Sequence, residues 1–436
     1  MKDGAEEPGV PPSLPRPSSF FLYPSSFPSG KRFLTPFSPG LWRVGGAVLV
    51  LAAASWGATA AEVRVKDTAG LRAALKALAP GTTVLIAPGK YDGNNWVSKA
   101  SGTEREPIAI RGQDPKDPPV FSGGKDAFHF SGCSYLTLAD LEVRGCSENG
   151  INADDAGVIE APATHLTFEN LRIFEIGPKG NHDAIKLSGV CDFLVRNCRI
   201  EGWGGQGIDM VGCHRGAVEL CHFEGREGFT PDNAVQMKGG SSQVLVQLCY
   251  FKNCGDRAIN LGGSTGLAFF RPKAGDCEAR EITVAGNRFV GGGAPVAWAT
   301  ADGGRFHHNT VYLPERYALR ILQESADPRF KPCHGGAFEN NLVVFDRQVR
   351  DFANVGPGTD PKSFVFRGNA WFEPGGGRKP ALPAPEPDGV YGLDPELKDP
   401  GLPTMKVGSA DPRLKDVGAD AYRPEGVRGT QTPPTP

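Results

Sequence analysis

Ala184-Ile185-Lys186-Leu187 is the first of four short segments that share one pattern: a small residue, an apolar residue, a polar residue and an apolar residue. The other three are Gly207-Ile208-Asp209-Met210, Ala234-Val235-Gln236-Met237 and Ala258-Ile259-Asn260-Leu261. Their first apolar residues follow one another at steps of 23, 27 and 24 residues. Side chains alternate between the two faces of a strand, so the apolar pair points one way and the polar residue the other. A repeat of this length predicts a chain wound into stacked coils.

Stacking places the polar residues of the four segments in one column. Its members are Lys186, Asp209, Gln236 and Asn260, and the spacing between neighbours is about 4.8 Å. We expect this column to be exposed and to be the place to look for function. A solvated face without any function would also alternate Lys with Asp, because like charges on neighbouring strands repel each other.

The composition agrees with many tight turns and argues against one class of partner. The 436 residues include 58 glycines and 38 prolines, well above the usual shares of about 7% and 5%. The formal net charge is −2, which gives no support to nucleic-acid binding, because that function requires a basic face.

The first 61 residues have the features of a leader. Lys31, Arg32 and Arg43 precede residues 44–61, which carry no charge, and Ala58-Thr59-Ala60 matches a small-x-small cleavage site. We therefore predict that residues 1–61 are a leader with a signal peptide and that the mature protein is secreted or periplasmic, with no membrane span. The alternative is a membrane anchor, since the uncharged stretch is at the lower length limit for a spanning helix.

The ten cysteines follow the repeat. Cys198, Cys221 and Cys249 each stand two residues before an apolar residue, a position that later units fill with Asn287, Asn309, Asn341 and Asn369. Cysteines that replace other residues in a repeat behave as small buried groups, so we predict mostly free thiols. Export would also permit disulfides, whose connectivity the sequence does not give.

The mature chain divides into three parts. Residues 62–127 are predicted to form an N-terminal cap and the first coils, with Thr68 capping a helix whose apolar face includes Leu71 and Leu75. Residues 128–375 carry the repeat. Residues 376–436 form a Pro-rich C-terminal tail, whose closing stretch is expected to pack back on the last coil.

Residues 68–78, 80–91 and 102–112 carry a family resemblance. The first is the cap helix, the second reads Pro-Gly-Thr-Thr-Val-Leu-Ile-Ala-Pro-Gly-Lys-Tyr, and the third reads Gly-Thr-Glu-Arg-Glu-Pro-Ile-Ala-Ile-Arg-Gly. This part resembles the right-handed parallel β-helix polysaccharide lyases, within the pectin lyase-like superfamily, particularly the group of alginate lyases and chondroitinase B. The resemblance implies an all-β fold, a right-handed parallel β-helix solenoid with an N-terminal α-helix cap. Many β-helix proteins of different activity share it, so it specifies the fold better than the chemistry.

The resemblance also implies an activity. Lyases of that group act on acidic polysaccharides, bind calcium through Asn and Glu clusters, and use Lys and Arg as base and acid. No paired-Glu motif occurs in the predicted column, so Ca²⁺ is retained only as an option, no other cofactor is predicted and no metal ligand is assigned. Polygalacturonases share the fold, and Asn181-His182-Asp183 with Asp209 is a partial match to their Asn-Thr-Asp and Asp-Asp motifs.

Two sets of residues are the candidate site. Lys186, Asp209, Arg257 and His182 are the catalytic candidates. The candidates for substrate binding are Asp183, Gln236, Lys238, Asn260, Arg271 and Arg320. β-Elimination from a uronate needs a cation at the carboxylate, a base for the α-proton and an acid at the leaving oxygen. Lys186 is a poor base, because the neighbouring Asp209 raises its pKa, and it is better suited to hold a substrate carboxylate.

Three functions remain open at this stage. The leading hypothesis is an exported monomeric lyase that cleaves a uronate-containing polysaccharide by β-elimination. The second is a glycoside hydrolase of the polygalacturonase type, with Asp183 and Asp209 one coil apart as its two carboxylates. The third is a β-helix without catalytic activity that binds glycan or packs in an envelope layer.

Overall fold

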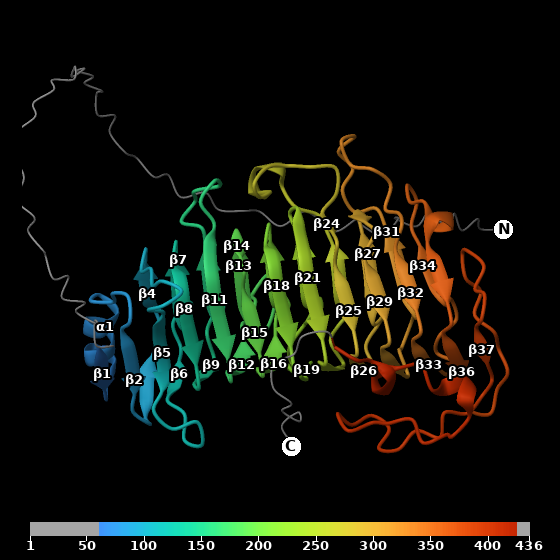
Figure 1. The fold of residues 1–436 in the computed structure, drawn as a ribbon, viewed down its shortest axis with the longest axis horizontal. Coiled ribbons are helices and arrows are strands. Elements are labelled where there is room, and N and C mark those ends of the chain that lie inside the picture. The colour runs from blue at the N-terminus through green and yellow to red at the C-terminus, as the bar shows by residue number, and fades with distance from the viewer. Residues whose placement is uncertain (1–60, 425–436) are drawn as a thin grey trace, which may run out of the picture. The chain divides into compact units, whose positions relative to one another are not determined.

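The computed structural model describes residues 61–424, and the predicted leader and the last twelve residues lie outside them. The described residues belong to one compact unit built from three parallel sheets, here named sheets A, B and C. Figure 1 shows their strands stacked side by side along one axis. Each coil of the chain contributes in turn to sheets A, B and C, so the predicted solenoid and its all-β class are confirmed.

Sheet A has 15 strands among the described residues. They are β1 (Glu62–Val65), β2 (Thr83–Ile86), β5 (Ile108–Gly112), β8 (Ser134–Ala139), β11 (Ala163–Glu169), β14 (Val190–Cys191), β15 (Leu194–Arg196), β18 (His214–Glu219), β21 (Ser241–Gln247), β24 (Ala279–Arg280), β25 (Thr283–Ala285), β28 (Ala301–Asp302), β29 (Arg305–His307), β32 (Ala337–Glu339) and β35 (Val365–Arg367).

From β8 onward, sheet B follows sheet A after a corner of two residues, and it has 12 strands among the described residues. They are β3 (Lys90–Asp92), β6 (Val120–Ser122), β9 (Glu142–Arg144), β12 (Arg172–Ile176), β16 (Arg199–Trp203), β19 (His222–Glu224), β22 (Tyr250–Lys252), β26 (Arg288–Val290), β30 (Thr310–Tyr312), β33 (Leu342–Val344), β36 (Ala370–Phe372) and β37 (Val390–Tyr391).

Sheet C holds the four segments of the repeat and has ten strands in the described part of the chain. They are β4 (Asn95–Ser98), β7 (Phe128–Ser131), β10 (Ile151–Asp154), β13 (Ile185–Ser188), β17 (Gln206–Val211), β20 (Asn233–Lys238), β23 (Arg257–Gly262), β27 (Val296–Ala299), β31 (Leu319–Leu322) and β34 (Ala353–Val355).

The core lies between the three sheets. Ile185, Leu187, Ile208 and Met210 are fully buried, as the alternation of the repeat predicts. Aromatic side chains stack from coil to coil: the rings of Phe223 and Phe251 are 4.9 Å apart, and the ring of Phe289 follows at 4.7 Å. The stack thus buries a continuous core that no single coil could form alone.

Helix α1 (Thr68–Leu75) covers the N-terminal end of the stack and buries Leu71 and Leu75. The predicted cap residue is wrong by one position. Asp67 is the N-cap and accepts a hydrogen bond from the Gly70 amide at 2.7 Å, whereas the Thr68 hydroxyl accepts one from the Asp92 amide at 3.1 Å. No helix in residues 61–424 is long and apolar enough to cross a membrane.

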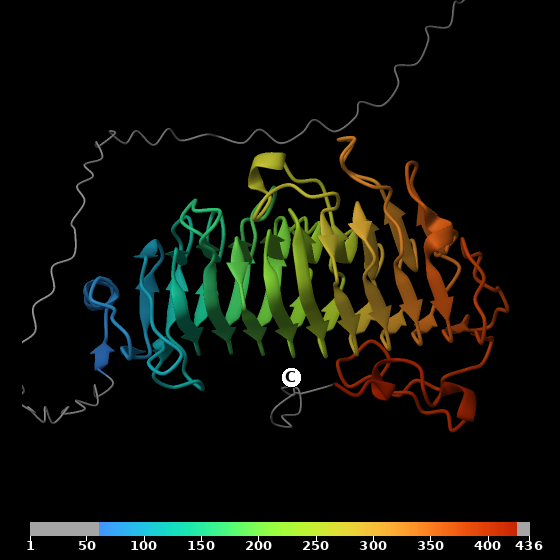
Figure 2. The ribbon, with the colours of Figure 1, turned by 45° about the horizontal axis from the view of Figure 1, so that its top comes forward.

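Loops and the C-terminal segment lie on different sides of the stack (Figure 1 and Figure 2). The long loops 155–162, 263–278 and 323–336 follow β10, β23 and β31 of sheet C. Residues 392–424 return along sheet B, where the Tyr250 hydroxyl donates to Gly401 O at 2.6 Å and the Tyr422 hydroxyl to Gln247 Oε1 at 2.8 Å. The segment therefore reaches well beyond the last coil, on which it was expected to pack.

Candidate functional site

The predicted column exists in sheet C. Lys186 pairs with Asp209, Asp209 with Gln236, and Gln236 with Asn260. Arg320 continues it two strands later, beyond Ala297. The expectation that the column is exposed is wrong for its middle, because Asp209, Gln236 and Asn260 are buried. The loop after β23 lies over them: a Cβ on Gly263 would be 2.9 Å from Gln236 Nε2.

Lys186 links two buried carboxylates. Its Nζ lies 2.8 Å from Asp183 Oδ2 and 2.7 Å from Asp209 Oδ2, and neither aspartate side chain is exposed. Lys238 Nζ donates to Gln236 Oε1 at 3.0 Å and lies 3.1 Å from Asp209 Oδ1, an ion pair without hydrogen-bond geometry. The ammonium groups of Lys186 and Lys238 thus lie next to buried carboxylates.

Neighbouring charged groups determine the protonation states of Lys186 and Asp209. Burial opposes charge on Lys186, but Asp183 and Asp209 outweigh it and raise the pKa of its ammonium group. Burial also opposes charge on Asp209, yet Lys186 and Lys238 lower the pKa of its carboxyl to about 2. Lys186 therefore stays protonated and does not act as a base, in agreement with the argument from its register beside Asp209.

The pair Asp183 and Asp209 does not have the geometry of an inverting hydrolase. Both Oδ2 atoms hydrogen-bond the same Lys186 Nζ, so their separation is less than the sum of the two bonds. An inverting enzyme needs about 6.5–9.5 Å between its carboxyl groups to admit water. Both groups are also buried, so the expectation that they flank a scissile bond is wrong.

Arg257 and Arg320 belong to a second network. Arg257 donates to Asn260 Oδ1 at 3.1 Å and to Glu324 Oε1 at 2.5 Å. Arg320 donates to Asn354 Oδ1 at 3.0 Å and also bonds Asp256, which is paired with Arg316 at 2.9 Å. Glu324 lies in the loop after β31, and its pairing was not predicted, because that loop is outside the repeat.

Arg271 does not join the predicted cluster. Its Nε lies 2.5 Å from Asp155 Oδ2, and its carbonyl oxygen is 3.2 Å from His214 Nε2. The loop 263–278 is thereby tied to the loop after β10. Arg271 anchors a loop, and its predicted contact with substrate has no support from this position.

His182 and Asp232 lie on the two rungs that flank Gly205. The Gly205 amide donates to His182 O and the Asp232 amide to Gly205 O, both at 2.9 Å, so the three residues are successive rungs. A Cβ at Gly205 would be only 3.0 Å from Asp183 Oδ1 and from His182 N. Two rungs separate His182 and Asp232 by about 9.6 Å of backbone. Gly205 lies between them, and the Asp183 carboxyl and the Gly180 carbonyl approach it so closely that a larger residue would force a shift.

The side chains of His182 and Asp232 have complementary properties. The His182 ring is half-buried and forms no hydrogen bond or ion pair with any residue in 61–424. Burial raises the pKa of the Asp232 carboxyl, the charges of Asp256 and Asp183 add to this, and Arg257 and Lys238 oppose it. The unengaged imidazole lies beside Gly177 and Gly180, two rungs from a carboxyl that holds its proton more tightly than usual. Of these two residues, the sequence analysis selected His182 and missed Asp232.

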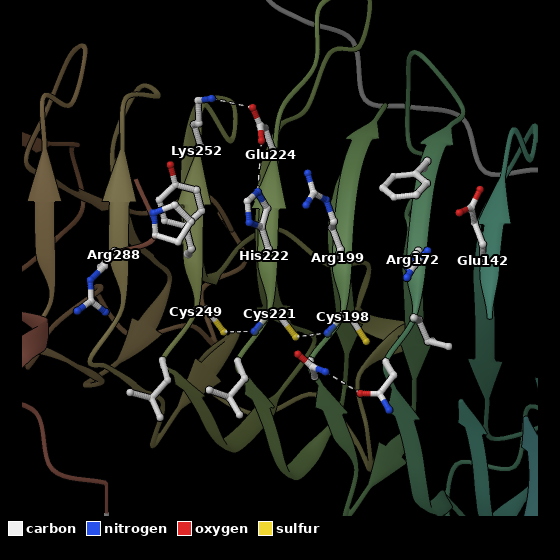
Figure 3. Close-up of a pocket in the computed structure, with 18 of the residues that line it drawn as sticks. Glu142, Arg172, Cys198, Arg199, Cys221, His222, Glu224, Cys249, Lys252 and Arg288 are labelled. Carbon is white, nitrogen blue, oxygen red and sulfur yellow. Dashed lines mark hydrogen bonds and ion pairs between the residues drawn. The ribbon is translucent and has the colours of Figure 1, made fainter. Parts of the chain in front are cut away.

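A cavity of about 920 Å³ lies elsewhere, on the outer face of sheet B. Figure 3 shows Arg172, Arg199 and His222 on neighbouring strands of its floor. None of the predicted site residues lines it. The signal was present in the sequence, since a polar residue directly follows the corner position in unit after unit, as in Leu171-Arg172 and Cys198-Arg199.

Metal ligands do not gather on sheet C. Within residues 61–424, His, Cys, Asp and Glu come together in threes at Glu201–His222–Glu224 and at Asp276–Cys277–Asp302. Basic side chains already pair with carboxylates of both groups: Lys252 with Glu224 at 2.8 Å and Lys331 with Asp276 at 2.7 Å. These residues do not suit Ca²⁺, which prefers oxygen ligands that no cation neutralises.

Comparisons with known proteins identify the fold. Residues 126–330 match the family model described as the right handed beta helix region. No curated protein matches the sequence. The predicted right-handed parallel β-helix fold is confirmed.

Solved structures are similar at low identity. An alginate lyase from Paenibacillus sp. str. FPU-7 is 17% identical with a TM-score of 0.46, over 70% of this chain and 99% of that chain. A PL6 family polysaccharide lyase from Pseudopedobacter saltans is 14% identical with a TM-score of 0.48, over 83% and 99%. The catalytic domain of a GH87 α-1,3-glucanase is 12% identical with a TM-score of 0.40, over 76% and 66%.

Proposed function

We propose that this right-handed parallel β-helix protein is an exported enzyme that cleaves a uronate-containing polysaccharide by β-elimination on the face of sheet C. The observation that carries the proposal is the register that places the free imidazole of His182 and the Asp232 carboxyl on the rungs on either side of Gly205. Lys186 and Lys238 lie beside it and provide the cations.

The residues divide the reaction as follows. The ammonium groups of Lys186 and Lys238 bind the uronate carboxylate and make the proton on the adjacent ring carbon, C5, more acidic. His182 removes that proton, a C4–C5 double bond forms, and the electron pair of the C4–O bond leaves with the glycosidic oxygen. Asp232 gives its proton to this oxygen, and its new carboxylate is stabilised by Arg257. Both groups then exchange protons with solvent.

A hydrolase is the second candidate, on a different pair from the one expected. Asp256 lies on the rung next to Asp232, since the Arg257 amide donates to Asp232 O at 3.2 Å. Asp256 is paired with Arg316 and Arg320, which favour its charged form, whereas the pKa of Asp232 is raised. A pair of carboxyl groups that differ in this way is typical of an acid with a base or nucleophile.

The experiment is an assay of the protein on a panel of uronate and neutral polysaccharides, with ultraviolet absorbance of unsaturated products and reducing ends followed together. We expect absorbance and reducing ends to rise in parallel on a uronate polymer. His182→Ala and Asp232→Asn should each lower kcat by roughly 100-fold or more, the usual contribution of an acid or base, with a smaller change in KM.

His165→Ala is the matched control, because His165 is exposed on sheet A and its variant should keep full activity. Reducing ends without absorbance would replace elimination by hydrolysis, with Asp256→Asn then inactive. Binding without either product across the panel would reject catalysis in favour of a glycan-binding module.

A further inference from the structure

One row of side chains runs along the floor of the cavity on sheet B. The row is in register over six strands and consists of Glu142, Arg172, Arg199, His222, Tyr250 and Arg288. Six adjacent strands span about 24 Å at the usual spacing of about 4.8 Å. Pro115 and Pro118 line one end, and residues 401–404 of the C-terminal segment line the other. The cavity is therefore an elongated groove parallel to the axis of the stack.

Two arginines stand next to each other in this groove (Figure 3). Arg172 and Arg199 are direct register partners on β12 and β16, an arrangement of like charges that destabilises a sheet. Arg199 is paired with Glu201. The guanidinium of Arg172 is exposed and has no hydrogen bond or ion pair with any described residue. A charge left uncompensated inside a concave site indicates an anionic ligand.

The other members of the row do not compete for that ligand. Burial lowers the pKa of His222, and Glu224 only partly offsets this effect, so the ring is neutral at neutral pH. Glu142 is paired with Arg144 at 2.8 Å. Arg288 donates to Met405 O at 2.8 Å and to Asp420 Oδ1 at 2.7 Å. The free positive charge is thus concentrated at Arg172.

Rings and amides surround the two arginines. The rings of His222 and Tyr250 are 4.9 Å apart, and Phe174 and Asn170 also line the groove. Phe174 and Tyr250 are buried, whereas the His222 ring and the Asn170 amide are half-buried. A ring next to an amide group suits a sugar, which offers C–H faces and hydroxyl groups together. Consecutive sugars of an extended chain repeat at close to the strand spacing, so one sugar can occupy each coil.

We propose that this groove is a second carbohydrate site, which binds an anionic oligosaccharide through the bidentate pairing of Arg172 and Arg199 with its carboxylate or sulfate groups. The site is independent of the chemistry proposed for sheet C. The C-terminal segment forms its end wall through the bond from the Tyr250 hydroxyl to Gly401 O.

The test is calorimetric titration of the full chain carrying His182→Ala, which prevents turnover on sheet C. Hexagalacturonate and a heparin hexasaccharide are the probes for carboxylate and sulfate, and maltohexaose is the neutral control. We expect a site for at least one anionic probe, weakened by added salt, and none for maltohexaose. Arg172→Gln should weaken this site at least tenfold, and Arg172→Gln with Arg199→Gln should remove it.

The matched control is Arg105→Gln, because Arg105 is also exposed and forms no hydrogen bond or ion pair with any residue in 61–424. This variant should leave the affinity unchanged. Thermal unfolding of Arg172→Gln should occur at or above the temperature of the parent, since no contact is lost and one of two neighbouring like charges is removed. Equal affinity in the double variant, equal binding of maltohexaose, or no site for either anionic probe would overturn the proposal. These outcomes are separate from activity on sheet C, which the products of the unmodified chain report.

Discussion

At Lys186 one ammonium group is held between two carboxylates that solvent does not reach. The residue type alone allowed a base, a cation for substrate, or a solvated surface charge. The contacts with Asp183 and Asp209 keep the ammonium group protonated. Of the three roles, these contacts therefore favour that of a cation for substrate. The same contacts make Lys186 part of the structure of sheet C as well as of its site.

Lys186→Met should therefore destabilise the protein strongly. It would leave two buried carboxylates near each other without a direct cation on Asp183, and breaking a buried pair costs about 3–5 kcal/mol. Urea unfolding of the variant would measure the loss. Adding Asp183→Asn and Asp209→Asn should restore most of it, because the two buried carboxylate charges are then removed. A free energy of unfolding unchanged in Lys186→Met would show that water, rather than Lys186, satisfies the two aspartates.

At the scale of the element, the corner between sheets A and B is a ladder of side chains. Each accepts the backbone amide of the preceding coil: Cys198 N donates to Cys221 Sγ, Cys249 N to Asn287 Oδ1 at 2.9 Å, and Asn309 N to Asn341 Oδ1 at 2.9 Å. All ten cysteines lie in the described residues and are free thiols, as predicted. Cys221 and Cys249 are acceptors in the ladder in addition to being small buried groups.

Asn309 offers a direct test of the ladder. Its side chain accepts from the Asn287 amide at 3.0 Å and donates to Val284 O at 3.0 Å. Asn309→Ala leaves the Asn287 amide and Val284 O buried and unpaired. The free energy of unfolding should fall by about 3 kcal/mol, since each unpaired buried group costs about 1–3 kcal/mol. Asn309→Cys should cost less, because cysteine accepts the same amide in earlier coils. Equal unfolding free energies for the two variants in urea would contradict this role.

At the scale of the whole described unit, the C-terminal segment packs against strands that belong to earlier coils. Leu414 and Val417 pack with Leu342 and Val344, and the ring of Tyr422 lies 5.9 Å from that of His307. This return of the chain also supplies one wall of the groove on sheet B. The repeat contains no signal for it, since the segment has no strand pattern.

The burial of His307 should make stability depend on pH. Burial lowers the pKa of His307 to about 4, and Arg305 and His308 contribute, with Glu339 opposing them. The unfolded chain binds a proton near the usual pKa of about 6.5, so stability should be lost as pH falls from about 6.5 to about 4. Urea midpoints across this range should fall less steeply in His307→Gln. An unchanged slope would assign the effect to other groups.

The spacing of the repeat was enough to predict the coils and the register of sheet C. Lys186 faces Asp209 and Asp209 faces Gln236 because strand side chains alternate and one coil places one strand. The apolar residues of the repeat are correspondingly buried. Local periodicity therefore determined the fold and the column, since each depends only on residues one coil apart.

Tertiary packing decided which of these residues a ligand can reach. The loop after β23 covers Gln236, Glu324 arrives from another loop to bind Arg257, and the groove requires residues 401–404 to return to Tyr250. These contacts join parts of the chain outside the repeat, so their positions follow from loop and tail packing rather than from any period. The sequence by itself determined the stack, and only the folded chain decided where its surface is open, buried or hollow.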